Sequence, residues 1–284
     1  MTRIAVLPYG QKLGPHLASM PLGRLQWPLG APADLSGTVG DLGAQDHLLV
    51  YPKTSMHTKW NWGTAALVSV MVVEPRMIHA RHLNMLRLSY RRFHRVFTHD
   101  AATLQRLPNA RFLPAASTWV PEFDDIDLTK TQNASLIASA RRDQDGHQLR
   151  HAVVETARAE GIDLQVMGRG YAPFEHKHEG HAPHRFSVVI ENTRAYGYFT
   201  EKLVDSLLCE SVPIYWGAPD IGAHFDASGM IVCTSRDEIL AALRHATPER
   251  YADMRAGLMR AKAQAIAVQD YRTRAAEILR DEAQ

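Results

Sequence analysis

The strongest constraint on the fold is one stretch from Phe186 to Phe225, which reads FSVVIENTRAYGYFTEKLVDSLLCESVPIYWGAPDIGAHF. It opens with FSVVIE, a nearly continuous apolar run typical of a strand that is buried on both faces. After a turn-rich loop, apolar residues repeat at helical spacing at Leu203, Val204, Leu207 and Leu208. VPIYW then indicates a second buried strand. This order predicts a parallel sheet with a crossover helix, and such sheets bind ligands at the carboxyl ends of their strands.

The start of this helix has the chemistry of an anion site. Thr200 is the predicted N-cap, so Glu201 and Lys202 fall in the first turn. A helix start offers unpaired amides and about half a positive charge, which together suit a phosphate. With Tyr196 and Tyr198 nearby, the pattern suggests a nucleotide diphosphate, with Glu201 accepting from sugar hydroxyls. The alternative is a solvated helix start with an ordinary Glu–Lys pair.

Three segments of this stretch together resemble the donor-binding signature of a known enzyme family. They are F-S-x-x-x-E-N, G-Y-x-T-E-K-x-x-D and V-P-I-Y-W-G-A-P-D-I, and they follow one another without an internal gap. The family is that of the α1,3/4-fucosyltransferases, glycosyltransferase family 10, and the chain looks like a bacterial form. The resemblance implies the GT-B fold, an α/β architecture in which two Rossmann-like domains with parallel sheets face a central cleft.

The resemblance also implies a reaction. The expected donor is GDP-β-L-fucose, whose sugar is transferred with inversion to a hydroxyl of a glycan acceptor of the surface polysaccharide or lipopolysaccharide type. No metal or other cofactor is expected to be required. Two alternatives remain open: a related transferase that uses another GDP-sugar such as GDP-mannose, and a non-catalytic protein that binds a nucleotide or a glycan.

Strands that alternate with helices along the chain predict two domains built on parallel sheets. The segment PEFDDIDLTKTQNA is polar and turn-prone, so the boundary is expected near Thr129. Residues 1–129 would form the acceptor-binding domain and residues 130–265 the donor-binding domain. In GT-B folds the final helix commonly crosses back, so 266–284 is expected to pack on the first domain.

The resemblance implies roles for several residues of the second domain. Arg150 would contact the diphosphate, because a guanidinium matches two phosphate oxygens. Arg141 and Arg142, which follow a predicted strand, are rival candidates. Lys202 and the amides from Thr200 onward would meet the charge of the departing GDP. The remaining expected donor contacts are those of Glu191, Asn192 and Glu201 with sugar and ribose hydroxyls, and that of Tyr198, which would line the donor pocket.

Glu74 is the candidate general base. It ends an apolar strand, and Pro75 follows it directly, whereas the family has a small residue between the glutamate and the proline. The alternative is a structural carboxylate at the strand end that pairs with Arg76 or a neighbour. If Glu74 is not the base, the next candidates in the same domain are Asp41, Asp46 and His79.

No metal site is predicted, although two segments resemble one. A loop contains four closely spaced histidines, but it lacks cysteine and includes basic neighbours that oppose a cation: His176, His178, His181 and His184. Asp125-Ile-Asp127 has the D-x-D pattern of metal-dependent transferases but falls in the linker. Gly168-Arg169-Gly170 lacks the third glycine of a dinucleotide turn.

Composition bears on partners and compartment. A formal net charge of +2 implies no nucleic-acid partner. Cys209 and Cys233 lie in apolar surroundings, which is typical of core thiols in a reducing compartment. We find no apolar run of membrane-spanning length and no signal peptide. The sequence therefore predicts a cytoplasmic protein, and a lipid-linked acceptor would bring it into peripheral contact with the inner membrane face.

Overall fold

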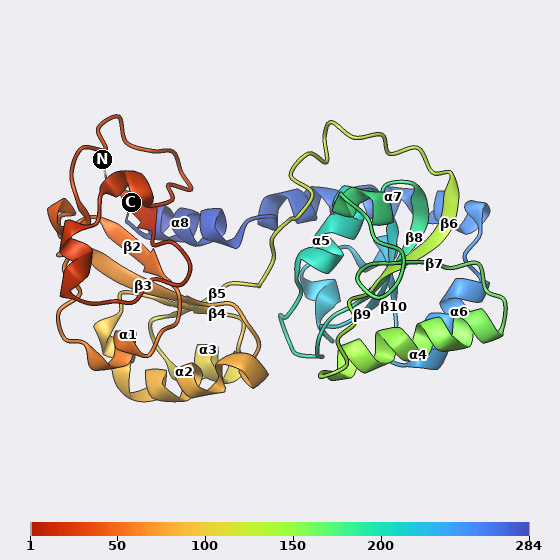
Figure 1. Ribbon diagram of the computed structural model, residues 1–284, viewed down its shortest axis with the longest axis horizontal. Coiled ribbons are helices and arrows are strands. Elements are labelled where there is room, and N and C mark those ends of the chain that lie inside the picture. Colours follow the sequence, from red (N-terminus) through yellow and green to blue (C-terminus); the bar gives the residue numbers. More distant parts are fainter. Residues whose placement is uncertain (1, 284) are drawn as a thin grey trace. The chain divides into compact units, whose positions relative to one another are not determined.

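The computed structural model describes residues 2–283, which divide into two compact units (Figure 1). The first unit comprises the chain up to Ala115 together with the segment from Asp270 onward, and the second unit is Ala116–Gln269. Each unit is built around a five-stranded sheet in which every pair of neighbouring strands is parallel. The predicted α/β class with two parallel sheets is confirmed.

The first sheet has the strand order β1-β2-β3-β4-β5, so each crossover moves in the same direction. Because parallel crossovers are right-handed, their helices all fall on one face, and Figure 1 shows α1, α2 and α3 on that side. The strands are β1 (Ile4–Val6), β2 (His47–Val50), β3 (Leu67–Val72), β4 (Val96–Thr98) and β5 (Ala110–Phe112). The helices are α1 (Ser55–Thr58), α2 (Arg76–Ser89) and α3 (Ala101–Arg106), with short 3₁₀ turns η1 (Pro15–Ser19), η2 (Leu22–Arg24), η3 (Val39–Asp41) and η4 (Tyr90–Arg92).

The other face of the first sheet is covered by the last helix of the chain, α8 (Tyr271–Glu282). Ala275, Ala276 and Leu279 of this helix share a buried cluster with Val6 and Met71 of the sheet. A sheet whose crossover helices all lie on one face needs a second cover for its other apolar face. The return of the C-terminal segment to the first unit supplies that cover.

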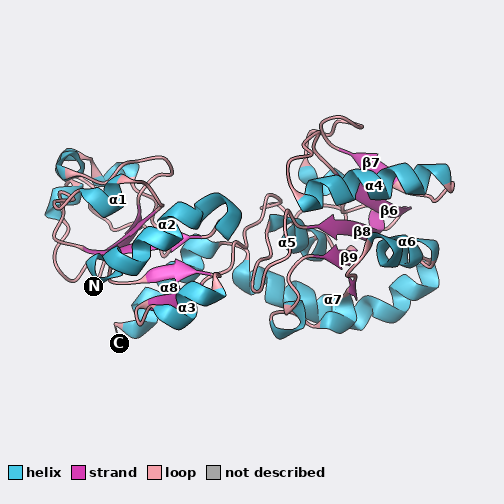
Figure 2. Ribbon diagram, turned by 90° about the horizontal axis from the view of Figure 1, so that it is seen from below, coloured by secondary structure: helices cyan, strands magenta, loops and turns pink. Residues whose placement is uncertain are grey.

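The second sheet has the order β10-β9-β8-β6-β7, which reverses direction between β6 and β8. Helices therefore lie on both faces: α4 packs beside α6 on one, and α5 beside α7 on the other, surrounding the strands in Figure 2. The strands are β6 (Gln132–Ile137), β7 (Gln165–Met167), β8 (His184–Ile190), β9 (Val212–Trp216) and β10 (Ile231–Val232). The helices are α4 (Asp145–Ala159), α5 (Glu201–Leu208), α6 (Arg236–Arg244) and α7 (Pro248–Val268), with 3₁₀ turns η5 (Lys177–Gly180), η6 (Ile221–Ala223) and η7 (Ala227–Gly229).

The unit boundary differs from the expected position near Thr129. The structure changes from the first unit to the second after Ala115. Ala116, Val120 and Phe123 are buried in the core of the second unit, so the segment that precedes β6 is packed against that unit. Because this segment is mostly polar, the sequence did not indicate that these three apolar residues are buried. The return to the first unit falls at Asp270, four residues after the expected start at 266.

The local structure of the signature agrees with the sequence. β8, α5 and β9 occupy the predicted places, and Thr200 caps α5 as expected, since its hydroxyl accepts from the amide of Lys202. Among residues 2–283, none of the helices has the length and apolar content needed to cross a bilayer.

Candidate active site

The predicted donor residues gather at the carboxyl edge of the second sheet. β6 leads through α4 to β7 in one direction, and β8 leads through α5 to β9 in the other. Between β6 and β8 the strand order reverses, which is the place where open parallel sheets form a ligand crevice. Glu191 and Asn192 follow β8 directly at this point.

Arg150 lies on α4 and holds the end of β8. Its side chain is 5% exposed; Nε donates to the carbonyl of Ile190 at 3.0 Å, and Nη2 donates to the same carbonyl and, at 3.0 Å, to Oδ1 of Asn192. Burial lowers the pKa of this guanidinium, and the nearby Glu191 carboxylate opposes that shift. Arg150 therefore positions Asn192. The rivals Arg141 and Arg142 are exposed on the surface and pair with Asp143 and Glu155, respectively.

The first turn of α4 also approaches the end of β8 very closely. The amide of Gly146 donates to the carbonyl of Asn192 at 3.1 Å. A Cβ atom at Gly146 would lie 1.8 Å from the carbonyl oxygen of Glu191, so a larger residue would force the two segments apart. Glycine at this position is what brings the start of α4 next to the loop that follows β8.

Glu191 has a different place from the one expected. It has no exposed surface, and its two oxygens accept from the amide and the hydroxyl of Thr200 at 2.8 and 2.7 Å. Burial raises the pKa of its carboxyl group, against the opposing effect of Lys202, whose Nζ lies 3.9 Å away. A fully buried carboxylate cannot reach a sugar hydroxyl in this conformation. Glu191 instead ties the end of β8 to the start of α5.

Lys202 and Glu201 lie in the first turn of α5, next to the contact between Glu191 and Thr200. Nζ of Lys202 donates to the hydroxyl of Thr200 at 3.1 Å and to Oε1 of Glu201 at 2.9 Å. The Lys202 side chain is 26% exposed and that of Glu201 is 16% exposed, so both can meet a ligand. The predicted Glu–Lys pair is present, but it is partly buried rather than fully exposed to solvent.

A second lysine, Lys177, completes the cluster, and the sequence analysis missed it. Its Nζ lies 2.7 Å from Oδ2 of Asp205 and 4.0 Å from Oε1 of Glu201. It also lies 4.6 Å from the centre of the exposed Trp119 ring. Lys177 belongs to the histidine-rich loop, which the sequence analysis considered only as a potential metal site. Asp205, the last residue of the G-Y-x-T-E-K-x-x-D string, was the available signal, because a buried carboxylate requires a partner.

Asp205 joins three parts of the second unit. It is fully buried and accepts from the hydroxyl of Thr118 at 2.7 Å and from the amide of Trp119 at 3.0 Å. Burial raises the pKa of Asp205, and the ion pair with Lys177 partly opposes the rise. Asp205 thus fixes both Lys177 and the segment that carries Trp119.

The start of α5 places two ammonium groups, Lys177 and Lys202, among the carboxylates of Glu191, Glu201 and Asp205. Burial alone would raise the pKa of Glu201, but Lys202 and Lys177 outweigh it and hold that pKa at about 2. Of the three carboxylates, that of Glu201 is partly exposed, and it lies with both ammonium groups at the positive end of the helix. A phosphate group that displaces or joins this carboxylate would find two cations already in place.

In the loop between β8 and α5, the two tyrosines that were predicted to lie near the donor differ in their exposure to solvent. Gly197 adopts φ of 63°, a conformation that favours glycine, and its amide donates to Oδ1 of Asp220 at 2.9 Å. The turn sends Tyr198 into the interior, where it is 1% exposed, and leaves Tyr196 63% exposed. Tyr196, rather than the expected Tyr198, therefore presents a ring to solvent beside the crevice.

Glu74 lies at the carboxyl edge of the first sheet, exposed, just after β3. Arg76, the residue named in the structural alternative for Glu74, forms a two-point ion pair with Asp100, at 2.9 and 2.6 Å. His79 follows in the first turn of α2, where its φ and ψ of −107° and 16° depart from helical values. Burial lowers the pKa of His79 to about 4, so it is neutral near pH 7.

Two other candidates for the base are placed elsewhere. Asp46 precedes β2, at the amino edge of the sheet, and is paired with Arg3 at 2.6 Å. Asp41 accepts from the amide and hydroxyl of Thr38 at 2.7 and 2.9 Å. Among the named candidates of this unit, Glu74 and His79 therefore share the carboxyl edge.

The four loop histidines have separate partners. Nδ1 of His178 bonds Glu122 at 2.8 Å, Nδ1 of His181 bonds the Ser187 hydroxyl at 2.9 Å, and Nε2 of His184 bonds Gln165 at 2.7 Å. The ring of His176 stacks on that of His178. Over residues 2–283, no three His, Cys, Asp or Glu side chains are grouped so that they could hold a metal ion.

Comparison with known proteins supports this reading of the fold. No protein-family model matches the chain. A segment of 57 residues is 35% identical to the α-(1,3)-fucosyltransferase FucT of Helicobacter pylori; it covers 20% of this chain and 12% of that protein. The match thus spans only a small part of the relative's length.

Solved structures share the fold over most of the chain. An α1,3-fucosyltransferase superposes with a TM-score of 0.51 and 19% identity, over 73% of this chain and 68% of that chain. The structure of an α1,3-fucosyltransferase with GDP-fucose gives 0.50 and 18%, over 81% and 70%. The trehalose-6-phosphate synthase OtsA gives 0.52 and 10%, over 84% and 73%.

These likenesses define the class as α/β proteins with the GT-B glycosyltransferase fold. Within that class, the predicted resemblance to the α1,3-fucosyltransferases is confirmed by the curated relative over a segment of 57 residues.

Proposed function

We propose that the protein is a glycosyltransferase that moves fucose from GDP-β-L-fucose to a hydroxyl of a glycan acceptor, with inversion at the anomeric carbon. The observation that carries the proposal is the cluster of Lys177, Glu201 and Lys202 at the capped start of α5, beside the reversal point of the second sheet. The resemblance of a 57-residue segment of the chain to a fucosyltransferase supports the choice of donor.

In this proposal the second unit binds the donor. Lys202, Lys177 and the first amides of α5 bind the diphosphate, because they combine two ammonium groups with the positive end of a helix. Glu201 accepts hydrogen bonds from sugar and ribose hydroxyls, and Asn192 accepts or donates hydrogen bonds to such hydroxyls. Arg150, Glu191 and Asp205 are positioning residues: their contacts are with the protein, and they hold the segments that carry the donor-binding side chains.

The chemistry is a single displacement. An acceptor hydroxyl forms a bond to the anomeric carbon of fucose as the bond to the phosphate oxygen of GDP breaks, and the leaving group takes the electron pair. Glu74 accepts the hydroxyl proton. The charge that grows on the GDP oxygen is stabilised by Lys177, Lys202 and the α5 amides, so the proposal requires no metal ion.

The first unit would select the acceptor, which we assign to surface polysaccharides or lipid-linked oligosaccharides. We place the reaction in the cytoplasm, with peripheral membrane contact through a lipid-linked acceptor. The buried thiols of Cys209 and Cys233, neither of which is in a disulfide, are consistent with a reducing compartment.

The test is a donor panel on the full chain. Calorimetry with GDP, GDP-fucose and GDP-mannose measures binding, and release of GDP in the presence and absence of acceptor glycans measures turnover. Turnover restricted to GDP-fucose supports the proposal. Turnover of GDP-mannose alone would reassign the donor, and GDP binding without turnover of any donor would identify a non-catalytic nucleotide-binding protein.

A further inference from the structure

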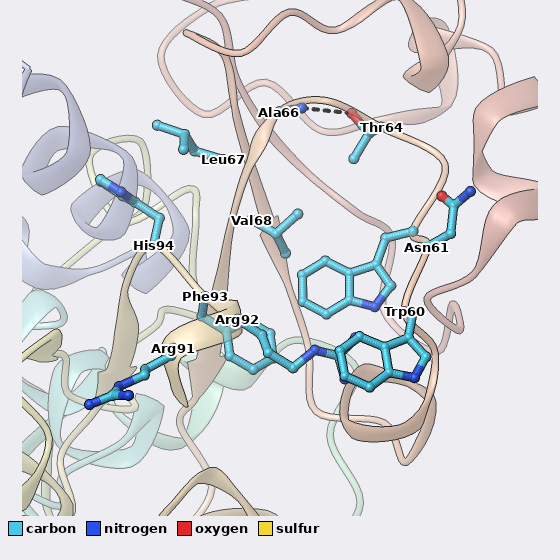
Figure 3. A pocket seen from close by; sticks show the side chains of 11 residues that line it. Trp60, Asn61, Thr64, Ala66, Leu67, Val68, Arg91, Arg92, Phe93 and His94 are labelled. Atoms are coloured by element: carbon cyan, nitrogen blue, oxygen red, sulfur yellow. Dashed lines mark hydrogen bonds between the residues drawn. The ribbon is translucent and has the colours of Figure 1, made fainter. Parts of the chain in front are cut away.

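The first unit contains a pocket of ≈ 550 Å³ that the proposed chemistry does not use (Figure 3). It lies at the start of β3, beside Leu67 and Val68, and beside the residues that precede β4. This is the amino edge of the sheet, opposite the edge that carries Glu74. Val68 and Glu74 are six residues apart on extended backbone, which corresponds to about 20 Å at ~3.3 Å per residue. The pocket is therefore separate from the candidate catalytic edge.

One wall of the pocket is a ladder of stacked side chains. Phe93 stacks on Trp62 with ring centres 5.3 Å apart, and the guanidinium of Arg92 lies 4.8 Å from Trp62 and 5.4 Å from Trp60. Nη1 of Arg92 donates to the carbonyl of Met56 at 3.0 Å, and Nη2 donates to the carbonyl of Lys59. The guanidinium is thus held by the backbone and fixes the rings on either side of it.

Trp60, at the end of the ladder, is exposed to solvent. Trp60 is 94% exposed, although its inner side faces Arg92. An indole that presents nearly its whole surface to water is an apolar surface available to a ligand.

The turn that carries the two tryptophans is preorganised. Oδ1 of Asn61 accepts from the amide of Gly63 at 2.7 Å. Gly63 has φ of +71°, and a Cβ there would lie 2.6 Å from the backbone nitrogen of Ala18, so this position is tightly packed against η1. A turn that is already ordered loses little entropy when a ligand binds.

We propose that this pocket is a second saccharide-binding site, which takes an acidic unit of the acceptor chain away from its reacting end. The C–H face of a sugar ring can lie on the indole of Trp60, with its hydroxyls within reach of the Asn61 amide at the same rim. The buried indole nitrogen of Trp62 has no hydrogen-bond partner among the described residues, so it is a further donor for the ligand.

Charge selects the kind of sugar. None of the residues that line the pocket is acidic, and Arg91 contributes an exposed guanidinium, whose Nε donates to the hydroxyl of Tyr90 at 3.2 Å. A carboxylate on the saccharide would be met by Arg91. That the saccharide belongs to the acceptor rests on the proposed function, whereas the binding itself does not.

The test measures binding directly, by nuclear magnetic resonance of the indole N–H groups of the five tryptophans. The probes are uronate-containing and neutral oligosaccharides of increasing length, and the Trp60→Phe and Trp62→Phe variants assign the two signals. Uronate oligosaccharides should shift the Trp60 and Trp62 signals. Trp60→Ala and Arg91→Ala should each weaken this binding roughly tenfold, as truncation of an interface anchor does.

Two controls separate this site from the proposed reaction. Leu88→Ala removes another side chain of the same unit that is 92% exposed, and it should leave binding unchanged. Glu74→Gln should retain saccharide binding whatever happens to fucose transfer, so the two proposals can fail independently. Shifts confined to tryptophans of the second unit, no binding of any saccharide, or equal binding by Trp60→Ala would overturn the inference.

Discussion

Removing the hydroxyl of Thr200 tests most directly how the proposed donor site is held together. This hydroxyl accepts from the amide and Nζ of Lys202, and it donates to the buried carboxylate of Glu191 at 2.7 Å. Thr200→Val keeps the shape of the side chain and removes all of these hydrogen bonds. Loss of an N-cap costs about 1 kcal/mol, and loss of a hydrogen bond to a charged group costs a further ~1.5–3 kcal/mol. The free energy of unfolding should therefore fall by roughly 2–4 kcal/mol.

Thr247→Val is the matched control. Thr247 caps α7 through the same type of bond, in which its hydroxyl accepts from the amide of Arg250 at 3.2 Å, but no buried carboxylate is involved. It should cost only the ~1 kcal/mol of a cap. Denaturant unfolding followed by tryptophan fluorescence measures both variants, and calorimetry should show weaker GDP binding only for Thr200→Val. Equal losses of stability in the two variants would refute the argument that Thr200 holds Glu191.

Four further predictions concern the chemistry and the charges of the site. Glu74→Gln should lower transfer by ~10²–10⁴-fold, the usual worth of a positioned base, while GDP affinity measured by calorimetry is retained; a near wild-type rate would move the search to His79. Lys202→Ala should weaken GDP binding by roughly 2–4 kcal/mol, whereas Lys262→Ala, which removes a lysine paired with Glu210 at 3.0 Å, should not; unchanged affinity in Lys202→Ala would exclude the phosphate role. Transfer should persist after exhaustive chelation, and a loss restored by manganese would revive the D-x-D reading of Asp125–Asp127. The pKa of Glu201 is lowered from 4.5 to about 2, so its ionised form stabilises the fold above pH 4.5 and that contribution is lost as the pH falls toward 2; acid titration of Glu201→Gln should show a weaker loss of stability in this window than the wild type, and identical profiles would contradict the assignment.

Much of the fold followed from local pattern. The apolar runs of β8 and β9, the helical spacing of α5 and the cap at Thr200 each depend on residues close together in the chain, and each was predicted correctly. The α/β class followed from the alternation of such segments. The resemblance to fucosyltransferases also rested on contiguous residues, because a helix start that binds an anion is assembled from one short stretch.

The tertiary structure decided which of these residues face a ligand. The sequence predicted that Glu191 and Tyr198 contact the donor, but it did not show that both are buried, since burial depends on segments that pack over them. The place of Lys177 in this cluster was not predicted, because its partner Asp205 lies twenty-eight residues further along the chain. The anchor between Thr118 and Asp205 spans 87 residues, and it placed the unit boundary before the polar segment rather than within it.

The same reason accounts for two further features of the first unit. The closing helix α8 covers the first sheet because all of that sheet's crossovers run in one direction, which is a property of strand order and not of composition. The ladder at the amino edge of that sheet joins the Trp60–Trp62 turn to Arg92 and Phe93, thirty residues away. Local sequence determined the elements and their caps, whereas contacts between distant segments determined which charges and rings remain exposed, because burial is set by neighbours in space.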